Sequence, residues 1–437
     1  MTGMHEHRSV YDAPAMSADP AARDLYEIGE IPPLGHVPKH MYAWVIRRER
    51  HGDPESAMQV EVVETPTIGP EEALVMVMSA GVNYNGVWAA FGQPVSPFDV
   101  HHHSHHVAGS DAAGIVWATG DRVKRWKVGD EVVVHCHQDD GDDIECNGGD
   151  PMYSPSQRIW GYETPDGSFA QFTRVQSRQL LPRPQHLSWE ESGCYTLTLA
   201  TAYRMLFGHR PHAVRPGQNV LVWGAAGGLG SMAVQLIATA GANAVGVISD
   251  ESKRDFVMSL GAKGAINRKL FECWGALPDL HDAVRYNEYM KEARRFGRAI
   301  WELTGKGKDV DIVFEHPGEA TFPVSCFVVK RGGMVVFCAG TSGYNLTMDA
   351  RFVWMRQKRI QGSHFANLLQ ASEANQLVVE RRIDPCLSEV FPWSEIPSAH
   401  RKMWRNQHQP GNMAVLVQAN QMSQRHQADA RRSEATA

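Results

Sequence analysis

The 437-residue sequence contains no run of about 18 apolar residues, the length that a transmembrane helix requires. Its first residues have neither a basic flank nor an apolar stretch, so we expect no signal peptide and a cytoplasmic location. Cys-x-x-Cys spacing is absent as well, and the seven cysteines are widely scattered. This pattern argues against a disulfide framework and against a structural zinc lobe.

Positive charge is not in excess, because 43 Lys and Arg residues are outnumbered by 49 Asp and Glu residues, for a formal net charge of −6. A nucleic-acid partner is therefore not expected, since the phosphate backbone selects a clustered basic surface. A local basic patch for a small phosphorylated ligand stays open. The hydrophobic content of 43% is typical of a globular protein, and the length favours two domains.

The first half of the chain shows short β-rich runs separated by glycine and aspartate turns. Residues 1–40 are mixed and polar, and we interpret them as an N-terminal arm with a short helix at 21–28. Residues 41–190 then predict a β-rich, barrel-like domain. The clearest candidate strands of this domain are residues 73–78, 131–135 and 169–175.

From residue 191 onward, strand and helix patterns alternate, which is typical of a doubly wound parallel sheet. We predict this domain over residues 191–365, with a charged helical insertion at about 271–298. Residues 366–418 are expected to return to the first domain, and 419–437 to form a disordered tail. The candidate strands of the parallel sheet are residues 219–223, 244–249, 263–267, 311–315 and 334–339.

A glycine turn follows the first of these strands directly, and apolar residues recur at helical spacing behind it. A strand, a glycine turn and a helix in this order present backbone N–H groups and a helix N-terminus to a pyrophosphate. The turn therefore predicts a dinucleotide cofactor. The expected contacts are Gly224, Ala225, Gly227, Gly228, Leu229 and Gly230.

The residues that meet the ribose 2′ position should distinguish NADPH from NAD. Asp250 could accept a hydrogen bond from the 2′-hydroxyl of NAD, but it stands between Ser249 and the pair Lys253 and Arg254. A serine followed by cations suits a 2′-phosphate better, because charge-assisted hydrogen bonds offset its desolvation. We therefore favour NADPH, with Ser249, Lys253 and Arg268 as its contacts.

Several longer motifs resemble known enzymes. GVNYNGVW, HVAGSDAAGIVWATG, GAAGGLG and VDIVFEHPGEATFP are similar to medium-chain dehydrogenase/reductases. WGYETPDGSFAQF, KRIQGSHFAN and CWGALP resemble, more narrowly, the crotonyl-CoA carboxylase/reductase family, over residues 41–418. The resemblance implies a GroES-like domain beside a Rossmann domain, and a homotetramer. It further implies NADPH-dependent reductive carboxylation of crotonyl-CoA with CO2 to (2S)-ethylmalonyl-CoA, the alternative being simple reduction of crotonyl-CoA or acrylyl-CoA.

No metal and no biotin are expected. Zinc enzymes of this superfamily carry a cysteine where Val82-Asn83-Tyr84 stands and a Gly-His-Glu where Gly109-Ser110-Asp111 stands. Amide and hydroxyl groups are poor zinc ligands. The histidines of residues 101–106 could bind a metal adventitiously, but we interpret this tract as a solvated loop. No biotinyl-lysine context of the Ala-Met-Lys-Met kind is present.

Four residues match the CO2 pocket of the family in their local contexts. The resemblance implies that Asn85 donates its amide N–H to CO2, and that Tyr162, where the family often has phenylalanine, shields the pocket from water. It implies that Glu163 and His364 hold CO2 through a shared water. Taken singly, each residue could instead be an ordinary turn or core residue.

The coenzyme A contacts are less specific. A stretch of cations interleaved with aromatic residues could bind phosphates and adenine, or could serve packing or an oligomer contact. We name Arg351 and Phe352 as the candidate substrate contacts. A quinone-reductase-like NADPH binder with a structural or nucleic-acid role is the remaining hypothesis of another class.

Overall fold

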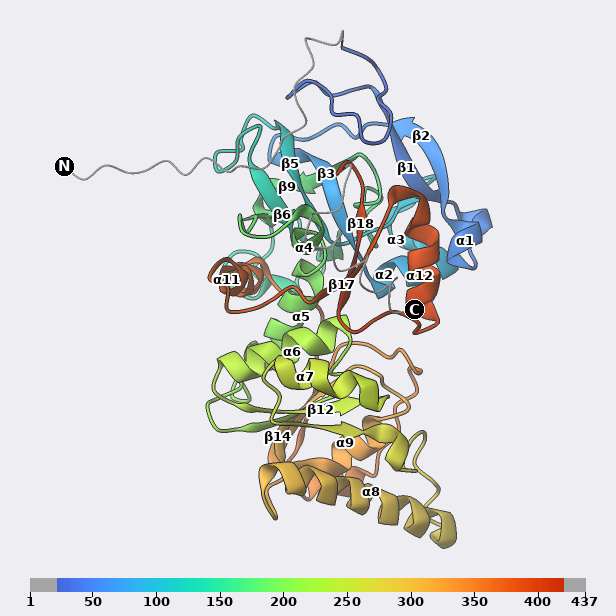
Figure 1. Cartoon of the computed structure of the whole chain (residues 1–437), viewed down its shortest axis with the longest axis vertical. Helices are drawn as coiled ribbons and strands as arrows, with labels where there is room; N and C mark the ends of the chain where they lie inside the picture. The colour runs from blue at the N-terminus through green and yellow to red at the C-terminus, as the bar shows by residue number, and fades with distance from the viewer. Residues whose placement is uncertain (1–21, 420–437) are drawn as a thin grey trace, which may run out of the picture.

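Two large sheets organise the chain, one mainly antiparallel and one parallel. The computed structural model describes residues 22–419, and in it the two sheets lie toward opposite ends of an elongated molecule (Figure 1). This arrangement confirms the predicted fold class, a GroES-like domain joined to a doubly wound one. Within residues 22–419, no helix combines the length and hydrophobicity needed to cross a membrane.

The first sheet is built around β3 (Glu72–Val82), whose side chains are almost all buried. Its strand order is β10-β6-β5-β3-β18-β17, and β9 also pairs with β3. The other strands of this sheet are β5 (Ala112–Thr119), β6 (Glu131–Val134), β9 (Phe172–Gln176), β10 (Leu180–Pro182), β17 (Leu387–Phe391) and β18 (Asn412–Leu416). Beside it lie β1 (His40–Ile46), β2 (Gln59–Glu64), β4 (His106–Val107), β7 (His137–Gln138) and β8 (Arg158–Ile159).

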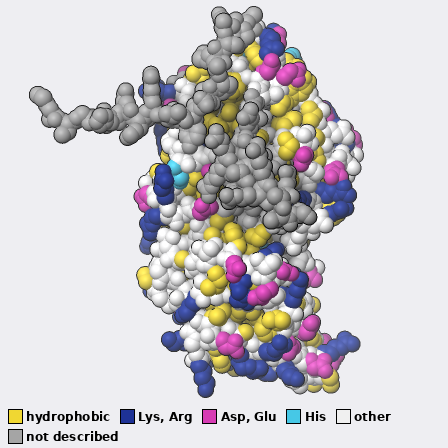
Figure 2. All heavy atoms as spheres, viewed as in Figure 1, with side chains coloured by type: hydrophobic (Ala, Val, Ile, Leu, Met, Phe, Trp, Pro, Cys, Tyr) yellow, Lys and Arg dark blue, Asp and Glu magenta, His cyan; other side chains and the backbone are white. Residues whose placement is uncertain are grey.

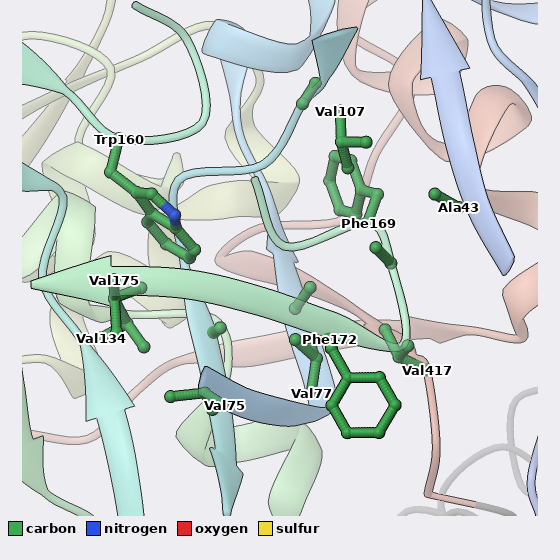
Figure 3. Close-up of a cluster of buried hydrophobic side chains, with 14 of the residues drawn as sticks. Ala43, Val75, Val77, Val107, Val134, Trp160, Phe169, Phe172, Val175 and Val417 are labelled. Carbon is green, nitrogen blue, oxygen red and sulfur yellow. The ribbon is translucent and has the colours of Figure 1, made fainter. Parts of the chain in front are cut away.

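The core of this domain fixes the turn that carries two of the candidate site residues. Trp160 and Phe169 are almost fully buried, and Figure 3 shows both side chains within one apolar cluster that also contains Phe172. The indole N–H of Trp160 donates a hydrogen bond to the carbonyl of Asp166, at 2.7 Å. Both ends of the turn around Tyr162 are therefore held by the core.

The second sheet has the order β13-β12-β11-β14-β15-β16, with every pair parallel. The strand order reverses between β11 and β14, which makes their carboxyl ends the expected place for a ligand. The strands are β11 (Asn219–Val222), β12 (Asn243–Ile248), β13 (Gly264–Asn267), β14 (Val310–Glu315), β15 (Val329–Phe337) and β16 (Arg359–Gly362). All five predicted strands of this sheet overlap observed ones.

Helices surround both sheets. The first domain carries α1 (Pro54–Ala57), α2 (Tyr84–Phe91), α3 (Pro97–His101), α4 (Trp189–Ser192) and α12 (Ile396–Trp404). The junction carries α5 (Thr196–Phe207) and α11 (Leu368–Val379), and the parallel sheet carries α6 (Gly228–Thr239), α7 (Arg254–Ser259), α8 (Ala283–Thr304), α9 (Phe322–Val328) and α10 (Ala350–Trp354).

The end of the chain returns to the first sheet. Strand β18 pairs antiparallel with β3, and Met413 lies opposite Val82. Figure 1 shows β17, β18 and α12, in the red of the late chain, among the blue elements of the early chain. The Rossmann sheet is therefore inserted between segments of the first domain, and the cleft between them is bounded by residues distant in sequence.

One local prediction was wrong, and the bounds of another are shifted. Residues 22–28 form no helix, because their carbonyls bond to other segments: His40 N–H donates to Asp24 and the Gln171 amide donates to Tyr26. The helical insertion begins only at Ala283, where Asp282 caps α8, and the preceding stretch from residue 271 is irregular. Residues 1–21, about half of the predicted arm, lie outside the described residues. The predicted tail lies outside them from residue 420 onward.

Surface charge is mixed where it can be seen. On the face in Figure 2, Lys and Arg side chains are interspersed with Asp and Glu along the molecule. Among the described residues, Lys330 pairs with Asp311 and Arg295 with Glu292. This face therefore offers no uninterrupted basic track of the kind that nucleic acid selects.

Candidate active site

The glycine turn has the geometry of a phosphate-binding loop. Gly224 has a φ of 54°, a left-handed conformation that favours glycine, and Gly227 precedes the first turn of the 12-residue helix α6. A Cβ at Gly230 would lie 2.2 Å from the carbonyl oxygen of Gly224. The turn can thus close only without a side chain there, and it directs the N-terminus of α6 toward the switch point.

The ribose corner separates the two cofactor alternatives. Asp250 accepts hydrogen bonds from the backbone N–H and hydroxyl of Ser252 and lies 3.4 Å from Lys269, so its carboxylate is engaged in a turn. Arg254 is likewise engaged, with Glu251 and the carbonyl of Ala265. These contacts leave the 2′ position to other side chains.

Lys253 and Arg268 are the cations left at this corner. Within the described residues neither makes an ion pair. Ser249 follows β12 and Arg268 follows β13, and these strand ends are adjacent because Ile248 pairs with Asn267. A hydroxyl and two cations at one corner suit a phosphate monoester.

The superfamily's zinc position is closed by hydrogen bonds. The amide of Asn83 donates to Asp111 at 2.9 Å, and Asp111 also accepts from the backbone of Leu197 and the hydroxyl of Thr196. Burial raises the pKa of Asp111 to about 6. No thiolate or imidazole takes part, so this donor set does not fit zinc. Elsewhere in residues 22–419, the one group able to share a cation is Asp140, Asp143 and Cys146, which does not include the histidine tract.

Asn85 lies in the first turn of α2, where its amide donates a hydrogen bond to the hydroxyl of Ser110, at 3.2 Å. The next residue, Gly86, leaves the room for His400, because a Cβ there would lie 2.3 Å from the imidazole. Helix α12 of the returning chain thus packs directly under the turn that carries Asn85.

The hydroxyl of Tyr162 is held by the backbone. The hydroxyl donates to the carbonyl of Val95 at 2.6 Å, and burial raises the pKa of Tyr162 to about 12. The polar atom of this side chain is therefore already satisfied, and the ring is free to pack as a phenylalanine would. Glu163 accepts a hydrogen bond from the backbone N–H of Ile159 at 2.7 Å, and burial raises the pKa of its carboxyl.

His364 lines a cavity of about 470 Å³ between the two domains. Desolvation, with smaller contributions from Arg204 and His137, lowers the pKa of His364, which keeps the imidazole neutral near pH 7. The ring of His364 lies against that of Phe365, with centroids 4.4 Å apart. The other lining residues are Met152, Tyr153, Arg204, His209, Phe337, Cys338, Ala339, Tyr344, Gly362 and Ser363.

Tyr344 connects the candidate residues across the cleft. It lines the cavity together with His364. Burial is the main cause of the raised pKa values of Tyr84 and Tyr162, and the proximity of Tyr344 adds a smaller contribution. Tyr84 is the neighbour of Asn85, and Tyr162 is the neighbour of Glu163. Of the four expected residues, His364 alone lines this cavity, and no hydrogen bond joins Asn85, Glu163 and His364 directly among the described residues.

Sequence reasoning missed Tyr344 and Arg204. Tyr344 follows a Gly-rich segment after β15, a signal for a loop at the carboxyl end of a parallel strand. Arg204 lies in the middle of α5, is 3% exposed at its side chain, and pairs with Asp150 at 2.8 Å. Nothing in its local sequence distinguishes it from an ordinary helix cation.

The weak coenzyme A candidates already have intramolecular partners. Arg351 forms an ion pair with Asp349, which also accepts from the hydroxyl of Tyr286, so it ties α10 to α8. Phe352 packs against Phe327 with ring centroids 5.2 Å apart. About half of the Arg351 side chain stays exposed to solvent, at 49%. A phosphate contact through Arg351 therefore stays a prediction.

Two family models match the chain. The model described as alcohol dehydrogenase GroES-like domain matches residues 69–185, and the model described as zinc-binding dehydrogenase matches residues 228–380. The chain is 74% identical to a crotonyl-CoA carboxylase/reductase of Cereibacter sphaeroides, over 94% of this chain and 93% of that protein. It is 42% identical to a crotonyl-CoA reductase of Streptomyces avermitilis, over 93% of this chain and 92% of the relative.

A solved crotonyl-CoA carboxylase/reductase superposes with a TM-score of 0.90 at 72% identity, covering 94% of this chain and 96% of the solved one. The crotonyl-CoA carboxylase/reductase AntE, solved in complex with NADP, superposes with a TM-score of 0.87 at 50% identity, covering 91% and 100%. The likeness thus extends over both domains and the cleft between them. The chain belongs to the crotonyl-CoA carboxylase/reductase family of the medium-chain dehydrogenase/reductases.

Proposed function

We propose that this chain catalyses the NADPH-dependent reductive carboxylation of crotonyl-CoA with CO2 to (2S)-ethylmalonyl-CoA. The observation that carries the proposal is the protonation state of two candidate residues, His364 and Tyr162, both of which burial keeps neutral. A neutral imidazole, a phenol with a pKa of about 12 and an amide favour interception of an enolate by CO2 over its protonation. Membership of the family supports the same activity.

The residues of the Rossmann domain fit NADPH. The N-terminus of α6 and the turn from Gly224 to Gly230 would hold the pyrophosphate, while Ser249, Lys253 and Arg268 would hold the 2′-phosphate. When bound, NADPH supplies the hydride for Cβ of the substrate. The relatives solved with NADP support this choice over NAD.

The first domain would hold CO2 and exclude water. The Asn85 amide can donate to an oxygen that gains negative charge as the carboxylate forms, so this hydrogen bond strengthens along the reaction. Glu163 and His364 would orient CO2 through a bridging water. The Tyr162 ring, its hydroxyl held by Val95, would keep other water from the reacting carbon.

Substrate binding and assembly are further parts of the proposal. Crotonyl-CoA would enter through the cavity lined by His364 and Tyr344, and Arg351 with Phe352 would contact its coenzyme A portion. We further propose a homotetramer working in the cytoplasm, with no metal and no biotin.

Purified protein incubated with crotonyl-CoA, NADPH and ¹⁴C-bicarbonate tests the activity. We expect labelled ethylmalonyl-CoA, one for each NADPH oxidised, at saturating CO2. A CO2-depleted reaction is the control and should give butyryl-CoA instead. An unlabelled product at saturating CO2 would reject carboxylation and leave simple enoyl-CoA reduction, the activity that the name of the Streptomyces avermitilis relative describes.

A further inference from the structure

A buried charged cluster lies behind His364 on the first domain. His137 and Asp139 are 0% and 2% exposed at their side chains, and the imidazole Nε2 lies 2.6 Å from an Asp139 carboxylate oxygen. Arg178, in the short 3-10 turn before β10, pairs with the other oxygen of Asp139, also at 2.6 Å. Burial opposes ionisation of Asp139, but the hydrogen bond from His137 and the charge of Arg178 outweigh it and lower the pKa of this carboxyl.

The cluster contacts the segment that carries His364. The ring of His137 lies beside that of Phe365, with centroids 6.0 Å apart, and Phe365 lies in turn against His364 at 4.4 Å. Two residues before His137, the Nε2 of His135 bonds to the carbonyl of Ala366 at 2.7 Å. Two histidines of the first domain therefore hold the backbone and ring next to His364, which itself belongs to the Rossmann side of the cleft.

The second ring nitrogen of each of these histidines, Nδ1, is buried without a hydrogen-bond partner among the described residues. Asp139 accepts from Nε2–H of His137, so the neutral ring keeps a bare lone pair on Nδ1. Within residues 22–419 this atom and the Nδ1 of His135 have no hydrogen-bond partner, although both are buried. Buried acceptors without partners destabilise a fold, so stability alone does not account for two such rings at this place.

We propose that His137, oriented by Asp139 and Arg178, is a positioning residue that sets the place of His364 in the CO2 site. The inference rests on the proposed function, because it assigns His137 a role through His364. Asp139 fixes the tautomer and the plane of His137, and His137 then supports Phe365 and His364 across the domain boundary. The reaction class this serves is carbon–carbon bond formation at Cα, and hydride transfer to Cβ does not depend on it.

The Asp139→Asn variant tests the proposal with little change in volume. We expect the ratio of ethylmalonyl-CoA to butyryl-CoA at limiting bicarbonate to fall roughly fivefold, the size of the net contribution of one typical hydrogen bond. The KM for CO2 should rise by a similar factor, while the kcat of NADPH oxidation changes less than twofold. His137→Gln provides a second route if Asp139→Asn does not fold.

Glu131→Gln is the matched control, because Glu131 pairs with the buried Arg183 at 2.7 Å on the same sheet but does not contact residues 364–366. It should leave the product ratio unchanged. In a His364→Asn background, Asp139→Asn should have no further effect on the ratio, since its influence runs through His364.

An unchanged product ratio in a folded Asp139→Asn protein overturns the inference, as does a full additional loss in the His364→Asn background. Failure of the proposed function looks different, because the wild-type protein would then incorporate no label at all.

Discussion

At the scale of single residues, the proposed chemistry depends on which groups hold protons. The His364 imidazole and the Tyr162 phenol are both kept in their neutral forms by burial. Neither is a good acid for the enolate carbon near pH 7, and this distinguishes a carboxylating site from one that protonates Cα. Under the proposed function, we therefore expect these residues to influence which product forms more than whether hydride is transferred.

Replacing Glu163 or His364 with alanine should change the product. We expect ethylmalonyl-CoA to fall at least about tenfold relative to butyryl-CoA, the effect of one lost polar contact in a dry site, while NADPH oxidation persists. Product analysis by liquid chromatography at fixed CO2 measures the ratio. Joint loss of both products in a folded variant would contradict a dedicated CO2-holding role.

Replacing Lys253 with alanine should weaken NADPH selectively. One lost charge-assisted hydrogen bond to the 2′-phosphate predicts that the KM for NADPH rises roughly tenfold, with little change for NADH. Initial rates with both cofactors measure this difference. Lys269→Ala is the matched control, because Lys269 already pairs with Asp250. Equal effects on the two cofactors would argue against contact between Lys253 and the phosphate.

At the scale of elements, the turn before α6 depends on backbone packing that a side chain would prevent. A Cβ at Gly230 would lie 2.2 Å from the Gly224 carbonyl, whereas at Gly227 the nearest atom is that same oxygen at 3.4 Å. The two glycines of one turn thus have different steric tolerance.

Gly230→Ala should displace the first turn of α6 and destabilise the domain by about 1–3 kcal/mol, the usual result of overpacking. The KM for NADPH should rise at the same time, because the N–H groups of the turn move. Gly227→Ala is the control and should be much milder. Thermal unfolding with and without NADPH measures both effects, and equal behaviour of the two variants would refute the steric argument.

For some elements, the local sequence pattern was sufficient to predict the secondary structure. The run from residue 219 to Gly230 predicted a strand, a turn and a helix, and all three are present, because spacing of apolar residues and glycines decides such a unit locally. The segment at residues 22–28 shows the opposite case. The local pattern predicts a helix there, but His40 and Gln171 donate hydrogen bonds to this segment instead. Both donors lie outside the segment, so its local sequence could not predict these bonds.

At the scale of the whole molecule, one buried carboxyl links stability to pH. Glu315, at the end of β14, accepts hydrogen bonds from Thr321, Ser325 and the backbone of Gly318. Burial outweighs these bonds and raises the pKa of Glu315 to about 7 from its ordinary 4.5. The folded protein therefore binds more protons than the unfolded chain between these two values, and its free energy of unfolding falls as the pH rises through that window.

Glu315→Gln should remove this contribution. The wild-type protein should lose up to about 1.4 kcal/mol per pH unit relative to the variant between pH 5 and pH 7. The difference in Tm between the two proteins, measured at several pH values, isolates Glu315 because all other groups are shared. A difference in Tm that stays constant with pH would show that Glu315 ionises normally in the fold.

The sequence by itself determined the class of this protein: alternating strands and helices, a glycine turn for a phosphate, and side chains unsuited to zinc are local or compositional features. The tertiary structure decided which distant residues meet. It pairs β18 with β3, brings His364 and Tyr344 to one cavity, and packs His137 against Phe365, the neighbour of His364. Register and burial create these long-range contacts and the protonation states that follow from them, and neither property exists in a chain before it folds.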